Sequence, residues 1–92
     1  MKARFSALAW EDYEYWQQTD HKILRRINDL IADIQKHPTQ GIGRPLPLRE
    51  KLAGCWARRI SEEHRLVYCE MGGEVVLLQL RQHYRKPDHS TE

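Results

Sequence analysis

The stretch from residue 65 to residue 84, RLVYCEMGGEVVLLQLRQHY, decides the fold. Two largely apolar runs, residues 65–71 and 74–84, are separated only by Gly72 and Gly73. A two-residue type I′ turn needs positive φ at both central positions, and glycine adopts that conformation without steric cost. The stretch therefore predicts an antiparallel β-hairpin.

Working outward from this hairpin, the preceding sequence alternates strand and helix signals. Short strand-like runs are predicted near residues 2–5, 46–48 and 55–61, and a helix with near-helical aromatic spacing over residues 8–17. A second helix begins after Asp20 as N-cap and ends before Pro38, which disfavours a helical residue before it. Its apolar stripe consists of Ile23, Leu24, Ile27, Leu30, Ile31 and Ile34. We therefore predict one α+β domain, with two N-terminal helices packed on a mainly antiparallel sheet.

The charge is unevenly distributed along the 92 residues. Residues 1–37 carry six Lys and Arg against six Asp and Glu, whereas residues 38–86 carry nine against five, a net charge of +4. Most of the basic residues are arginines, whose planar guanidinium suits phosphate. The second half therefore favours a polyanionic partner, with an ordinary solvated surface as the alternative.

The two cysteines and the absence of long apolar runs bear on the compartment. Cys55 and Cys69 have neither CxxC spacing nor histidines at zinc-finger spacing, so we expect two reduced core residues. No apolar run approaches a membrane span, and the N-terminus lacks the apolar core of a signal peptide. These features predict a cytoplasmic protein without a membrane partner.

The predicted hairpin brings basic side chains together at its open end. Alternation along the last strand puts Arg81 and His83 on one face, and the strand pairing brings Arg65 close to both. Histidine can move a proton near neutral pH, and arginine can neutralise charge that develops on phosphorus. The cluster favours a ribonuclease site, with a hydrated sheet edge as the alternative. No residues have metal-ligand spacing, so we expect neither a metal nor another cofactor.

Four segments carry a resemblance to a known family. They are WEDYEYWQQTD (residues 10–20), KILRRINDLIADI (22–34), GIGRPLPLREKLAGCWARRISEEHRLVY (41–68) and RQHY (81–84). Along residues 1–84 the chain resembles the YoeB subgroup of the RelE/ParE superfamily of bacterial toxins. The resemblance implies one RelE-like, microbial RNase-type two-layer domain over residues 1–84, followed by a polar tail over residues 85–92.

The resemblance also implies an activity and assigns residues to it. Members of the subgroup act as type II toxins that cut mRNA in the ribosomal decoding site and so halt translation. By position, Arg65 matches the phosphate-stabilising arginine, His83 the general acid and Tyr84 the residue that helps place the scissile nucleotide. Contacts with RNA or the ribosome are expected from Arg49, Arg59 and Glu63 by position, and from Arg81 as a member of the hairpin cluster.

One departure from the family pattern falls on the general base. Where the family motif reads Pro-Glu-Pro-Leu, this chain has Leu46 between two prolines. An aliphatic side chain cannot accept a proton. Either activity is reduced, or Glu50, Glu63 or His64 supplies the base, or solvent or the ribosome activates the RNA 2′-hydroxyl.

Two functions from different classes therefore stay open. The first is a metal-independent mRNA endoribonuclease neutralised by a cognate, YefM-like antitoxin. The second is an inactive homologue that binds the antitoxin and acts as a transcriptional co-repressor, contacting operator DNA only through that antitoxin. In both cases the resemblance implies a homodimer. The ending His83-Tyr84 argues against the gyrase-directed ParE branch.

Overall fold

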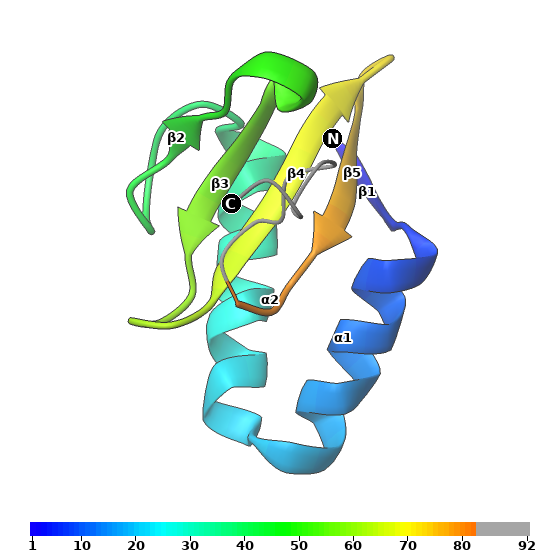
Figure 1. Ribbon diagram of the computed structural model, residues 1–92, viewed down its shortest axis with the longest axis vertical. Helices are drawn as coiled ribbons and strands as arrows, with labels where there is room; N and C mark the ends of the chain where they lie inside the picture. Colours follow the sequence, from blue (N-terminus) through cyan, green and yellow to red (C-terminus); the bar gives the residue numbers. More distant parts are fainter. Residues whose placement is uncertain (83–92) are drawn as a thin grey trace.

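The computed structural model describes residues 1–82, which form two helices on one side of a five-stranded sheet (Figure 1). The spatial order is β1-β5-β4-β3-β2, with β1 parallel to β5 and every other pairing antiparallel. This confirms the predicted α+β class with a mainly antiparallel sheet. The elements are β1 (Lys2–Phe5), α1 (Ala7–Thr19), α2 (His21–Lys36), β2 (Leu46–Pro47), the short 3-10 helix η1 (Glu50–Leu52), β3 (Cys55–Arg59), β4 (Arg65–Met71) and β5 (Glu74–Gln79).

Side-chain caps begin both helices. The Ser6 hydroxyl accepts a hydrogen bond from the N–H of Ala9 at the start of α1, and the Asp20 carboxylate accepts from the first turn of α2. Each cap satisfies backbone donors that have no partner inside the helix. The predicted apolar stripe of α2 is confirmed, and its centre is buried against the sheet. Helix α1 extends one residue earlier and two residues later than predicted. Neither described helix is long and apolar enough to cross a membrane.

The β4–β5 hairpin turns at Gly72 and Gly73, whose φ angles of 60° and 80° confirm the predicted glycine turn. Its far end differs from the prediction. The pairing shifts by one residue between Val67–Gln79 and Tyr68–Leu77, and β5 ends at Gln79. A one-residue shift changes which face the following side chains occupy. Strand β3 also ends two residues earlier than predicted.

Strict alternation along residues 74–84 puts Leu78 and Leu80 on one face, and the shift separates them. Leu78 packs with a small cluster on the side of the sheet away from the helices, whereas Leu80 is buried in the helix-side core. The expectation of strict alternation through this region is therefore wrong. The helix-side core also contains Ala9, Trp16, Ile27, Leu30, Ile34, Ile60, Leu66, Tyr68, Val75 and Leu77.

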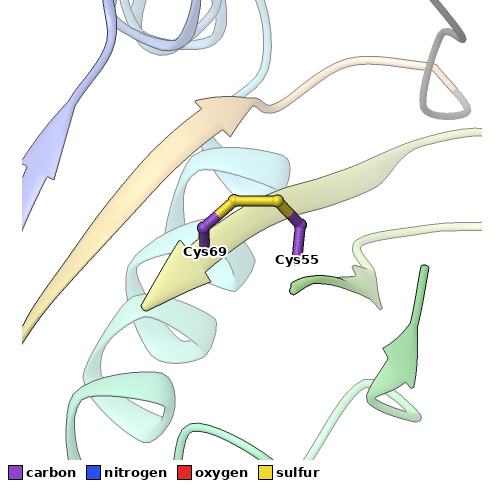
Figure 2. Close-up of a disulfide and its surroundings, with 2 residues drawn as sticks. All are labelled: Cys55 and Cys69. Atoms are coloured by element: carbon purple, nitrogen blue, oxygen red, sulfur yellow. A yellow bond between two sulfur atoms is a disulfide. The ribbon is translucent and has the colours of Figure 1, made fainter. Parts of the chain in front are cut away.

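The prediction of two reduced cysteines is also wrong in this structure. Cys55 and Cys69 form a disulfide between β3 and β4 (Figure 2). They are paired residues in the antiparallel register, with Cα atoms 4.2 Å apart, because both lie seven positions from Glu62 in the turn between the strands. The expectation was based on the cellular compartment and on motif spacing, and neither of these predicts which residues are paired across two strands.

A buried arginine links the sheet to the loop after α2. Arg58 is fully buried and donates to the Asp33 carboxylate, the Tyr68 hydroxyl and the backbone oxygens of residues 37, 40 and 42. The hydrogen bond from Arg58 holds the pKa of the Asp33 carboxyl below its usual value. Burial raises the pKa of Tyr68. A buried guanidinium needs this degree of compensation to be tolerated.

Candidate functional site

Three of the predicted site residues, Leu46, Arg59 and Arg65, lie on the sheet face opposite the helices, here called the open face. Directly paired residues of neighbouring strands project to the same side of a sheet. Leu46 pairs with Ala57, and Arg59 pairs with Arg65. Because Ala57 packs with the small cluster away from the helices, this register puts Leu46, Arg59 and Arg65 on the open face. The disulfide lies on the same face.

Arg65 is held in place by the turn that precedes β4. Its Nη1 donates to the backbone oxygens of Ser61, Glu62 and His64 at 2.7, 3.2 and 3.0 Å. All three bonds use the same nitrogen, so they fix the guanidinium without engaging its other two nitrogens. An orientation fixed in advance is what stabilisation of a developing phosphate charge requires.

Arg59 lies directly opposite Arg65 in the β3–β4 register. Its Nη2 is 3.4 Å from Glu62 Oε1, and about a third of its side chain is exposed. Like charges directly opposite each other across two strands are unfavourable, and an anion near both offsets the repulsion. The two guanidinium groups are therefore suited to bind a phosphate through charge-assisted hydrogen bonds.

Leu46, Arg49 and Glu63 lie further out. Leu46 is 58% exposed on the edge strand β2, between two prolines, and so presents an apolar side chain to solvent. Arg49 is exposed at the start of η1, and three quarters of the Glu63 side chain is exposed in the turn before β4. Exposure leaves each of them accessible to a large partner.

Arg81 does not join the cluster that we predicted with Arg65. Its guanidinium lies over the ring of Tyr15 in α1, 3.7 Å from the centroid, a cation–π contact. The shift in register and the early end of β5 redirect it toward α1. His83 and Tyr84, with residues 85–92, lie outside the described residues. The backbone N–H of Arg65 donates to the backbone oxygen of Gln82, the residue before His83, at 2.8 Å.

Sequence reasoning missed the side chains that hold residues 80–82. Asp12 and Trp16 were assigned to helix α1 without a role toward this segment, yet both bond the backbone of Leu80. His64 was considered as a base, but its Nδ1 accepts from the N–H of Gln82 at 2.7 Å. The spacing of Ala9, Asp12 and Trp16 on one buried helix face was the available signal. Within residues 1–82, no three His, Cys, Asp or Glu side chains are grouped to hold a metal ion.

Comparison with known proteins identifies the family. The model of the YoeB-like toxins of bacterial type II toxin-antitoxin systems matches residues 5–84. The chain belongs to this family. It is 46% identical to toxin YoeB of Streptomyces coelicolor over 84 residues, which are 91% of this chain and all of that protein. The family assignment confirms the resemblance predicted from the sequence.

Solved structures of YoeB proteins share the fold. A YoeB/ParE toxin from Agrobacterium tumefaciens superposes with a TM-score of 0.89 at 43% identity, covering 91% of this chain and all of that one. YoeB of Staphylococcus aureus, described as a dimer, gives a TM-score of 0.84 at 39% identity, and its complex with YefM gives 0.83 at 38% identity. Each covers 91% of this chain and 98% of the other.

Proposed function

We propose that this YoeB-family chain is a ribosome-dependent endoribonuclease that cuts mRNA and so inhibits translation. The observation that carries the proposal is the Arg59–Arg65 pair on the open face, with the Arg65 guanidinium fixed by three backbone oxygens. A ribosomal target also implies that the protein acts in the cytoplasm.

In the proposed reaction the 2′-hydroxyl of one nucleotide attacks the adjacent phosphorus, and the bond to the 5′-oxygen of the next nucleotide breaks. The products are a 2′,3′-cyclic phosphate and a free 5′-hydroxyl, and a water molecule that opens the cyclic phosphate gives the 3′-phosphate. Arg65 stabilises the charge on the non-bridging oxygens, His83 protonates the leaving oxygen and Tyr84 helps place the scissile nucleotide. Arg49, Arg59, Glu63 and Arg81 are proposed to contact RNA or the ribosome.

Leu46 occupies the position where a general base is expected, and we propose that it limits the rate. Its exposure and the flanking prolines, which restrict the backbone, support the idea that a carboxylate at this position would be presented to substrate. General base catalysis contributes about a hundredfold to ten-thousandfold. Leu46→Glu should therefore raise cleavage by that order.

The test measures single-turnover mRNA cleavage on programmed ribosomes by primer extension, together with ribosome affinity, for the present chain and Leu46→Glu. Affinity should change little, because one side chain is small beside the arginine contacts to phosphate. Leu46→Gln, similar in size but unable to act as a base, is the matched control. Equal cleavage by the chain and by Leu46→Glu would reject this position as the missing base, and Glu63 would be tested next.

A second candidate function is favoured by the same leucine. An inactive toxin homologue would still bind the antitoxin and act as a co-repressor that reaches operator DNA only through it. Primer extension separates the two functions directly. Absence of cleavage by both the present chain and Leu46→Glu, with antitoxin binding retained, would favour the binding protein.

We also propose that the chain forms a homodimer and binds a YefM-like antitoxin, because YoeB of Staphylococcus aureus forms a dimer and a complex with YefM. The net charge of +4 over residues 38–86 suits an acidic, partly disordered segment that folds over the basic surface. The association rate should then fall steeply as salt is added. A salt-independent association rate would contradict this mode of binding.

A further inference from the structure

The backbone of Gln82, the residue before His83, is hydrogen-bonded to two consecutive residues, His64 just before β4 and Arg65 at its start. His64 Nδ1 accepts its N–H at 2.7 Å, and its oxygen accepts the N–H of Arg65 at 2.8 Å. Gln82 has a φ of 57°, in the left-handed region that non-glycine residues rarely occupy. A conformation of this kind persists where surrounding contacts impose it. Both polar backbone groups of Gln82 are thus fixed, one by a side chain and one by a backbone.

The backbone two residues earlier is fixed from the side of α1. Leu80 donates its N–H to the buried Asp12 carboxylate at 2.9 Å, and its oxygen accepts the Trp16 Nε1–H at 3.0 Å. The Trp16 ring also packs edge to face on His64, with centroids 4.8 Å apart. One helix therefore orients both the segment and the histidine that binds it.

The chemistry of the His64 bond defines its protonation. A backbone N–H can only donate, so Nδ1 carries its lone pair and the ring is the neutral tautomer with its proton on Nε2. The backbone N–H of His64 donates to Ser61 Oγ, in the same turn whose carbonyls hold the Arg65 guanidinium. The ring is accordingly engaged as a structural acceptor and is not free to act as the missing general base.

We propose that His64 is a positioning residue for cleavage. Through Nδ1 it fixes the backbone of Gln82 beside Arg65, and Gln82 is the residue that precedes His83, the proposed proton donor, in the sequence. The inference rests on the proposed endoribonuclease function. A small misplacement of reacting groups can cost about a hundredfold in rate.

The test compares two substitutions that differ only in the acceptor. His64→Asn can place an amide oxygen close to the position of Nδ1, whereas His64→Leu fills similar space with no acceptor. His21→Leu is the matched control, since His21 is exposed at the start of α2. Three quantities are measured on the full chain: hydrogen exchange of the Gln82 amide by NMR, single-turnover cleavage at saturating ribosomes, and ribosome affinity.

We expect His64→Leu to lose Gln82 amide protection and about ten- to a hundredfold in single-turnover rate, with affinity nearly unchanged. His64→Asn should recover much of both, and His21→Leu should resemble the wild type. Thermal unfolding identifies any variant that fails to fold, and the Asn variant then carries the comparison. Unchanged cleavage by His64→Leu, although the hydrogen bond to the Gln82 amide is lost, would overturn the inference while leaving the proposed function intact.

Failure of the proposed function has a different signature. If the wild type and Leu46→Glu cleave no mRNA, the endoribonuclease assignment fails and the catalytic role of His64 fails with it. The Gln82 amide exchange would still show whether His64 binds the backbone there. A Gln82 amide that exchanges equally fast in wild type and His64→Leu would overturn the anchor itself.

Discussion

Arg58 and Arg59 are neighbours in β3, yet they serve opposite sides of the sheet. The Arg58 guanidinium is fully buried and bonded to a carboxylate, a phenol and three backbone oxygens. The Arg59 guanidinium is partly exposed on the open face, with one long contact to Glu62. Strand alternation alone produces this division.

The contrast shows that the basic charge of the second half has two uses. Arg58 stabilises the fold, because a buried charge is tolerated only when each of its donors has a hydrogen-bond acceptor. Arg59 has guanidinium donors that an external anion can reach, and its partial exposure leaves its charge solvated. A count of arginines therefore overstates the number of guanidinium groups that remain available to an external anion.

The largest effect is expected from Arg58→Met. Removing this guanidinium leaves Asp33, the Tyr68 hydroxyl and three backbone oxygens without their donor, and breaking a buried pair in this way costs about 3–5 kcal/mol. Urea unfolding measures the loss. The matched substitution Arg59→Met should cost under about 1 kcal/mol, as expected for an exposed ion pair. Equal losses in the two variants would contradict the division between the faces.

Arg65→Ala should act on cleavage and hardly on folding. Removal of a fixed charge-stabilising group costs about 3 kcal/mol in activation free energy, roughly a hundredfold in rate. The bonds it makes to the turn are to a partly exposed segment, so the free energy of unfolding should fall by only about 1 kcal/mol. Cleavage on programmed ribosomes and urea unfolding test the two halves. A stability loss as large as that of Arg58→Met would place Arg65 with the structural arginines.

Acid should weaken the hydrogen-bond network around Arg58. Because the folded-state pKa of Asp33 is lowered, its contribution to stability is complete above the unfolded value and is lost as pH falls toward the folded value. Asp33→Asn should lower the free energy of unfolding at neutral pH, because the charged acceptor of the Arg58 guanidinium is lost. The difference from wild type in urea unfolding should shrink below about pH 4. A difference independent of pH would argue against the carboxylate.

The smallest effect on folding is expected from Arg59→Gln, which should act on RNA binding. Loss of one phosphate contact lowers the salt dependence of affinity by about one unit of slope. Ribosome or RNA affinity measured across a salt series gives this slope. Lys36→Gln, on the last turn of α2, offers a control of equal charge change away from the open face. An identical slope for both variants would remove Arg59 from the anion site.

How far sequence reasoning succeeds depends on the range of the interaction involved. The glycine turn, the Asp20 cap and the apolar stripe of α2 are local patterns, and the structure confirms each of them. The end of β5, the side taken by Arg81 and the bond between His64 and Gln82 depend on a register shift and on packing against α1. The roles of His83, Tyr84 and Leu46 stay predictions from family resemblance, and the contacts of residues 80–82 were not foreseen.

By itself, the sequence determined the element order, the hairpin and the family, because periodicity and turn chemistry act over a few residues and need no knowledge of distant partners. Only the tertiary structure decided that Cys55 meets Cys69, that Arg58 is buried while Arg59 is not, and that His64 binds the backbone before His83. These outcomes depend on which residues are brought opposite one another across strands. That choice is made by burial of the whole core, where one residue of register moves a side chain from one face to the other.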